Sequence, residues 1–256
     1  MATGRKWSPI VQEKLFDWEK VLALPIKECR EELVPASLIP DKLLVHPIYF
    51  LNGIEGALPE CYVRRGVLAL LLEAAGRLPP GFRLVLLDGW RPITLQTALF
   101  NKYREELREA MPFKNDEELD PLAARFVASP SSRPERPSPH LTGGAVDITI
   151  ADDNGFCLYM GSGFDETTDR SGTAYYEKKA SSGGAVAERT LEALDNRRML
   201  FTAMTGAGFT NYPDEWWHFD YGNQNWAFMK GERTAFYGAA EPGFRWKRDN
   251  PKGQAK

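Results

Sequence analysis

The histidines of this 256-residue chain are the first residues to weigh, because imidazole is the commonest metal ligand in proteins and the chain has only three. Two of them stand near acids: His140 precedes Asp147, and His218 follows Glu215. Two neutral imidazoles, one carboxylate and an open fourth position for water form a catalytic zinc site, whereas structural zinc sites are closed, usually by thiolates. His140, Asp147 and His218 are therefore candidate ligands of one zinc ion per chain.

Each of these residues also has a structural explanation when it is taken alone. An isolated histidine on a strand is more often a satisfied core or surface residue, and Asp147 could pair with an arginine or cap a helix. Glu215 could be a solvated acid at the start of a strand. The combination is rarer than its parts and favours a metal site. His46, which precedes Pro47 in a loop, has no such neighbours and is interpreted as structural.

Glu215 is the candidate general base of a hydrolytic reaction. Zinc lowers the pKa of a bound water to about 7, and a carboxylate that does not bind the metal can take a proton from that water and pass it to the leaving amine. In a flat strand, Glu215 and His218 would point to opposite faces. Because Pro213 disfavours regular pairing, we expect Glu215 on a turn or bulge before the strand, so that both side chains reach the site.

Arg91 is the candidate for stabilising the negative charge that develops on a peptide carbonyl during hydrolysis. It stands in the sequence Asp88-Gly-Trp-Arg91-Pro92, where a predicted buried strand ends and a helix begins. An ion pair with Asp88 or with a surface acid is the alternative explanation of this arginine.

The elements that must position these residues follow from apolar spacing and from proline and glycine. The pattern predicts helices over residues 10–22, 63–78, 92–110 and 186–207, and strands over 82–87, 145–150 and 209–221. Asp147 falls on the more polar face of a half-buried strand, and the Gly143-Gly144 hinge lets the chain fold back toward His140. Helices and strands alternate without a regular βαβ rhythm, which favours an α+β fold.

The composition excludes several classes of protein. The net charge is −3, so the chain lacks the basic field that attracts nucleic acid or acidic membranes. No apolar run reaches the roughly 18–20 residues that span a bilayer, and no secretory signal is visible. The cysteines Cys29, Cys61 and Cys157 are odd in number and far apart, which favours reduced thiols in a cytoplasmic protein.

Four motifs carry a resemblance to a known family. Ser138-x-His140-x-x-Gly143-x-Ala145-x-Asp147, followed by Glu215-x-Trp217-His218, resembles the D-alanyl-D-alanine dipeptidases of the vancomycin-resistance type. These belong to a wider group of zinc D,D-peptidases related to the Hedgehog signalling domain. Asp88-Gly-x-Arg91-Pro92 and Met160-Gly-Ser-Gly-Phe-Asp165 match in the same order. The resemblance covers about residues 45–221.

The resemblance implies a role for each matching residue. It implies that His140, Asp147 and His218 bind zinc, that Glu215 is the base and that Arg91 contacts the scissile carbonyl. It further implies that Asp165 anchors the free amine of a small dipeptide, with Ser138 nearby. The implied fold has a central, mainly antiparallel sheet flanked by helices.

We therefore expect a single catalytic domain over residues 1–256, with its core at about 45–221 and an N-terminal helical and a C-terminal extension. The expected activity is hydrolysis of D-alanyl-D-alanine or a similar D-configured dipeptide, in the turnover of cell-wall (peptidoglycan) precursors. One alternative is a carboxypeptidase or endopeptidase that acts on peptidoglycan stem peptides. Another is a zinc-containing binding domain without catalysis, although a purely structural metal needs neither Glu215 nor Arg91.

Overall fold

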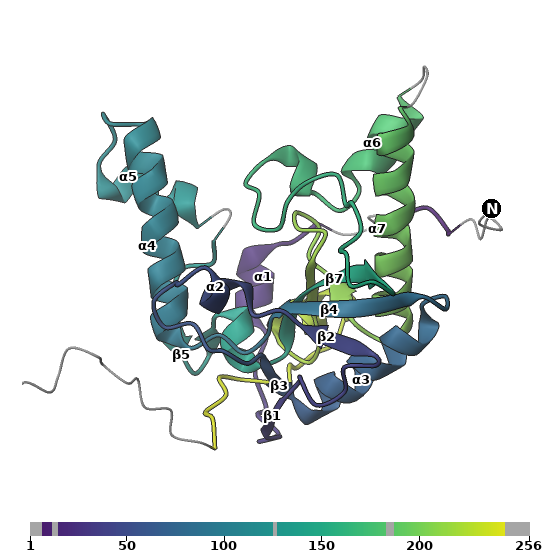
Figure 1. Ribbon diagram of the computed structural model, residues 1–256. Coiled ribbons are helices and arrows are strands. Elements are labelled where there is room, and N and C mark those ends of the chain that lie inside the picture. The colour runs from purple at the N-terminus through teal and green to yellow at the C-terminus, as the bar shows by residue number, and fades with distance from the viewer. Residues whose placement is uncertain (1–6, 12–14, 125–126, 183–186, 244–256) are drawn as a thin grey trace, which may run out of the picture.

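The centre of the protein is one five-stranded sheet, shown by a computed structural model that describes residues 7–11, 15–124, 127–182 and 187–243 (Figure 1). The strands, in spatial order, are β2 (Leu43–Val45), β4 (Phe82–Asp88), β7 (Ala145–Asp152), β9 (His218–Asp220) and β8 (Thr210–Asn211). Only β2 and β4 pair in parallel; the other three pairs are antiparallel. The predicted α+β fold with a mainly antiparallel sheet is confirmed.

The register of this sheet places the candidate metal ligands next to each other. Asp147 in β7 stands opposite His218 in β9 and, on its other side, opposite Asp88 at the end of β4. The β4–β7 register shifts between Leu86 and Asp88, as in a β-bulge, which re-aims the strand end toward the site.

One face of the sheet packs against α3 (Arg65–Arg77) and α7 (Glu188–Gly206). Apolar residues at alternate positions of β4 and β7 meet helix residues there, among them Leu84, Leu86, Val146, Ile148, Ile150, Leu71 and Leu200. Because side chains alternate along a strand, Asp147 points to the opposite face.

That opposite face is also covered, so the expectation of a half-buried strand at 145–150 is wrong. Val85, Leu87 and Ala151 form a second cluster there, against Ile48 of α2 (Ile48–Leu51) and Phe164 of the glycine-rich segment. The strand β7 is therefore buried on both sides almost to its end. The covering segments are remote in sequence, so the alternation pattern of β7 could not reveal them.

Further helices and short strands lie around this sheet. They are α1 (Trp18–Ala23), β1 (Leu33–Pro35), β3 (Tyr62–Arg64), α4 (Ile93–Ala110), α5 (Asp116–Ala123), β5 (Ser132–Arg133), β6 (Arg136–Pro137), η1 (Pro139–Thr142), η2 (Asp169–Ser171), α6 (Tyr175–Ser181) and α8 (Gln224–Lys230). Within the described ranges, no helix combines the length and apolar character needed to cross a membrane.

The predicted helix over residues 10–22 is wrong at residues 10–11 and 15–17. The helix α1 begins only at Trp18, where the Asp17 side chain accepts a hydrogen bond from the Lys20 backbone and caps it. Further upstream, the backbone amide of Ile10 donates to Glu177 Oε1 at 2.8 Å instead of to a helical carbonyl. A tertiary contact overrides the local pattern there; residues 12–14 lie outside the described part.

The other predicted helices shift less. The segment 63–78 begins as β3, which pairs with β1, and becomes helical at Arg65. The helices predicted at 92–110 and 186–207 correspond to α4 and α7. Near the two ends of the described chain, Lys27 and Cys29 donate backbone hydrogen bonds to Ala235 and Phe236, so the two extensions pair with each other. A single catalytic domain over residues 1–256 stays a prediction.

Candidate metal centre

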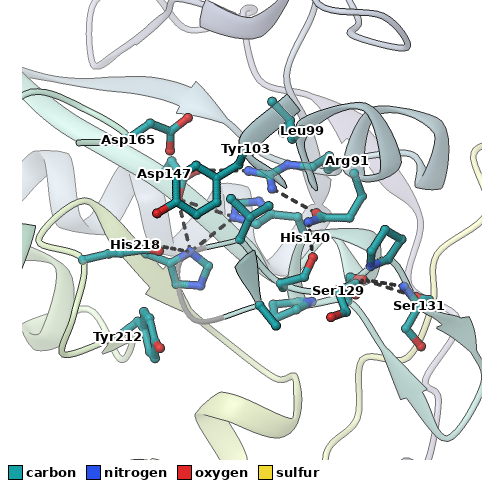
Figure 2. A pocket seen from close by; sticks show the side chains of 18 of the residues that line it. Arg91, Leu99, Tyr103, Ser129, Ser131, His140, Asp147, Asp165, Tyr212 and His218 are labelled. Atoms are coloured by element: carbon teal, nitrogen blue, oxygen red, sulfur yellow. Dashed lines mark hydrogen bonds and ion pairs between the residues drawn. The ribbon is translucent and has the colours of Figure 1, made fainter. Parts of the chain in front are cut away.

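Three ligand atoms form a nearly equilateral triangle on the face of the sheet opposite α3 and α7 (Figure 2). His140 Nε2 lies 3.3 Å from His218 Nδ1 and 3.4 Å from Asp147 Oδ1, and the last two atoms are 3.2 Å apart. A tetrahedral zinc ion with bonds of about 2.0–2.2 Å holds its ligand atoms about 3.3 Å apart. The sequence prediction thus selected three residues that the structure brings together at the spacing of a zinc site.

The chemistry of the donor set also fits a cation. Asp147 is almost fully buried, yet its Oδ1 has no hydrogen-bond donor among the described residues. A buried acceptor without a partner is costly, and a metal ion at the centre of the triangle would satisfy it. The residues present therefore fit the zinc ion that the sequence predicts.

The outer nitrogens of both histidines have acceptors, which leaves the inner nitrogens free to bind a metal. His140 Nδ1 lies 2.8 Å from the Gly89 carbonyl oxygen, and His218 Nε2 lies 3.2 Å from Asp220 Oδ2. Asp220 is fully buried and accepts further hydrogen bonds from Asn223 and Asn225. Asp220 does not stand in any of the sequence motifs, although its place two residues after His218 on one strand is a usable signal.

A tight turn delivers His140 to this centre. The residue lies in η1, and Gly143 ends that turn with a φ of +69°, a conformation that favours glycine. A Cβ on the next residue, Gly144, would lie only 2.3 Å from the Tyr221 carbonyl oxygen. The hinge predicted from the two glycines is confirmed.

Glu215 lies beside the triangle on irregular backbone, as predicted. Its amide donates to the Tyr212 carbonyl, and its own carbonyl accepts from His218, so the segment is a turn before β9. Glu215 Oε2 is 3.6 Å from His218 Nδ1. Burial raises the pKa of Glu215 to about 8. The charge of His218 opposes this rise, and repulsion from Asp147 adds to it. A dication nearby would favour the ionised, proton-accepting form.

Arg91 satisfies both explanations that the sequence left open. Its Nε donates to Asp88 Oδ2 at 2.8 Å and its Nη1 to Gln96 Oε1 at 2.9 Å, so the guanidinium is held on two sides. Its Nη2 lies 3.4 Å from Asp147 Oδ2 and borders the cavity. The ion pair with Asp88 positions the arginine at the site and does not remove it from the site.

Asp165 lines the cavity and, as seen from His140, lies beyond Asp147 (Figure 2). Tyr49 donates its hydroxyl to Asp165 Oδ2 at 2.6 Å, and the tyrosine ring stands 5.1 Å from the Arg91 guanidinium carbon. The Asp165 side chain is exposed on its cavity side although many protein atoms surround it; their desolvating effect, followed by repulsion from Asp147, raises the pKa of Asp165 to about 6. Tyr49 was missed because its segment has no periodic signal.

Ser138 lines the same cavity, but its hydroxyl is engaged locally. It accepts from the Ser131 amide at 3.0 Å and donates to the Ser129 carbonyl at 3.2 Å, so it fastens the loop that leads to His140. Its contact with substrate stays a prediction. His46 is exposed and lies outside the site.

The cavity around these groups has a volume of about 710 Å³. Its walls include α1, α4, the β5–β6 hairpin, the segment around Asp165 and the turn at Glu215. Trp217 lines the cavity, whereas Trp216 packs in the core and donates to Ser162.

The chain is similar to known peptidases. Residues 61–234 match the model of a peptidase family, M15, that is described as D-ala-D-ala dipeptidase. A D-alanyl-D-alanine dipeptidase of Synechocystis sp. is 31% identical over 237 residues, which are 86% of this chain and 96% of that protein. The dipeptidase of Escherichia coli is 34% identical over 140 residues, 55% of each chain. Among solved structures, VanYB in complex with D-Alanine-D-Alanine matches with a TM-score of 0.40 and 17% identity, over 70% of this chain and 83% of that one.

Proposed function

The chain belongs to the D-ala-D-ala dipeptidase family, and we propose on this basis that it hydrolyses D-alanyl-D-alanine to two molecules of D-alanine. His140, Asp147 and His218 hold one zinc ion in this proposal. The observation that carries it is the triangle of ligand atoms with Glu215 and Arg91 directly beside it. A metal that only stabilised the fold would need neither residue.

Each residue of the site has its own role in the proposed hydrolysis. What zinc supplies when it is bound is a water of lowered pKa and a positive charge near the carbonyl oxygen. Glu215 takes the proton of the attacking water and delivers it to the leaving amine. Arg91 Nη2 donates to the carbonyl oxygen as it becomes negative. Asp165 binds the free ammonium group. This favours substrates in which the residue that carries the scissile carbonyl also carries the free amine.

A substrate panel on zinc-loaded protein tests the proposal. We expect hydrolysis of D-alanyl-D-alanine, much slower hydrolysis of L,L- and L,D-dipeptides, and about one zinc per chain by metal analysis. A folded protein that is fully active without metal would contradict the scheme.

One observation favours a second candidate activity. The cavity of about 710 Å³ lies in the range of roughly 300–1,000 Å³ that is typical for larger ligands, and D-alanyl-D-alanine has only methyl side chains. A D,D-carboxypeptidase that acts on peptidoglycan stem peptides would use the additional space. Including a pentapeptide ending in D-alanyl-D-alanine in the panel separates the two activities.

We further propose that the protein works in the cytoplasm, in the turnover of cell-wall precursors. The support is the set of three cysteines, all free thiols, since oxidising compartments favour disulfides. Cell fractionation tests the location. Measuring the D-alanyl-D-alanine pool after deletion of the gene tests the role, because loss of the enzyme should raise that pool.

A further inference from the structure

Arg133 and Arg136 stand directly opposite each other in the β5–β6 hairpin. Opposite residues of an antiparallel pair share one face, and like charges in such a pair destabilise it. Both arginines line the cavity, both are exposed, and neither forms an ion pair within the described ranges of the chain. Two unpaired guanidinium groups at a cavity wall offer a place for an anion.

The hairpin that carries the two arginines is fixed to the rest of the protein. Gln224 of α8 donates to the carbonyl oxygen of Glu135, at the tip of the hairpin, with a distance of 3.1 Å. At its base, the Ser138 hydroxyl joins the backbone of Ser129 and Ser131. The arginine backbone is therefore held in place before any ligand arrives, which reduces the cost of ordering it on binding.

The hairpin lies on the opposite side of the metal centre from Asp165. Figure 2 shows Asp165 and Ser131 at opposite sides of the view with the candidate metal ligands between them, and Ser131 directly precedes β5. Across the cavity, the order is an acid, the metal centre and a basic pair. A peptide with a free amine and a free carboxylate has the complementary order of charges around its scissile bond.

We propose that Arg133 and Arg136 form an anion subsite that binds a carboxylate on the C-terminal side of the scissile bond. This inference rests on the proposed function and names a further part of its substrate. The carboxylate is either the C-terminus of the dipeptide or an acidic side chain of a leaving residue larger than alanine. Arginine suits both, because its planar guanidinium can donate two parallel hydrogen bonds to one carboxylate.

The other cationic groups of the cavity, Arg91 and Lys102, already have partners within the protein. Arg91 is engaged by Asp88 and Gln96. Lys102 lies 4.0 Å from Glu106, an acid on its own helix. Arg133 and Arg136 are the cationic side chains of the cavity wall without an acidic partner in the described structure.

Binding measurements without turnover test the subsite. The variant R133Q/R136Q is compared with its parent in a Glu215→Gln background, and zinc-loaded protein is titrated with D-alanyl-D-alanine by calorimetry. Loss of charged hydrogen bonds of this kind should weaken binding by about tenfold to a hundredfold. The matched control is Arg233→Gln, which removes the same charge from an exposed position outside the cavity and should leave the Kd unchanged.

Modified ligands identify which carboxylate is bound. If the C-terminus occupies the subsite, the effect of R133Q/R136Q disappears with the C-terminal amide of D-alanyl-D-alanine. If a side chain occupies it, the effect appears with D-alanyl-D-glutamate and not with D-alanyl-D-glutamine. Equal Kd values for the variant and its parent with all of these ligands would overturn the proposal.

Kinetics with Glu215 intact separate this inference from the proposed function. We expect R133Q/R136Q to raise KM and to leave kcat unchanged, since neither arginine contacts the reacting atoms. Hydrolysis with the same KM in variant and wild type would remove the subsite and keep the dipeptidase activity. If the wild type bound the dipeptide through the two arginines but did not hydrolyse it, the subsite would be kept and the proposed dipeptidase activity would be lost. The melting temperature should not fall, because the substitutions remove a like-charge pair.

Discussion

Asp147 and His218 face each other across the β7–β9 pair, with Asp147 Oδ1 and His218 Nδ1 3.2 Å apart. The contact joins residues that are far apart in the sequence, and the register of two antiparallel strands fixes it. A shift of one residue would turn either side chain to the opposite face of the sheet, toward α3 and α7. The metal centre therefore depends on the same pairing that aligns the core.

Replacing Glu215 by glutamine should abolish turnover and keep the metal. The amide has nearly the same shape but cannot accept the proton, so we expect kcat to fall about 10²–10⁴-fold. Zinc content and melting temperature should match the wild type. Undiminished turnover in this variant would remove Glu215 from its role as base.

Asp220→Ala should weaken zinc binding. Asp220 orients the His218 ring through Nε2, and loss of such a partner typically costs about 10–100-fold in metal affinity. Chelator competition measures the change. Asp195→Asn, at an exposed position of α7, is the control and should bind zinc as the wild type does. If Asp220→Ala bound zinc with wild-type affinity, the hydrogen bond to His218 would have no role in tuning the metal.

The affinity for free dipeptides should depend on pH through Asp165. Its pKa is raised to about 6, so its ionised form exists above that pH and is lost as the pH falls through it. Since the ionised form attracts the substrate ammonium, KM for D-alanyl-D-alanine should rise below about pH 6. Protonation of the metal ligands affects all substrates alike, so N-acetyl-D-alanyl-D-alanine, which lacks the ammonium, is the reference. A parallel pH profile for both substrates would contradict the role of Asp165.

Gly144→Ala should destabilise the protein and Gly76→Ala should not. A Cβ at Gly144 would meet the Tyr221 carbonyl oxygen at 2.3 Å, and this backbone has little room to move because both residues directly adjoin the β7–β9 pair and the Tyr221 amide donates to the Gly144 carbonyl. We expect a loss of about 1–3 kcal/mol, typical of overpacking. A Cβ at Gly76, within α3, meets nothing within 4 Å, and alanine is favoured in a helix by about 0.5–1 kcal/mol. Thermal or urea unfolding compares the two variants.

The sequence alone selected the residues that the structure brings together at the candidate metal centre. His140, Asp147, Glu215 and His218 stand in short motifs, and the family resemblance that these motifs carry, together with their residue types, was enough to select them. Pro213 even indicated that Glu215 lies on irregular backbone, which the turn confirms. The α+β class followed from the order of the elements, because apolar spacing and helix-breaking residues act locally.

Contacts between remote segments were decided only by the tertiary structure. Tyr49 reaches Asp165, and Ile10 binds Glu177, through packing that no local pattern encodes. The strand β7 is buried on both faces because segments far along the chain cover it. Arg133 and Arg136 are placed opposite each other and in the cavity wall only by the tertiary structure. Local spacing fixes which side chains share a face, whereas strand register and the packing of distant segments fix what those side chains meet.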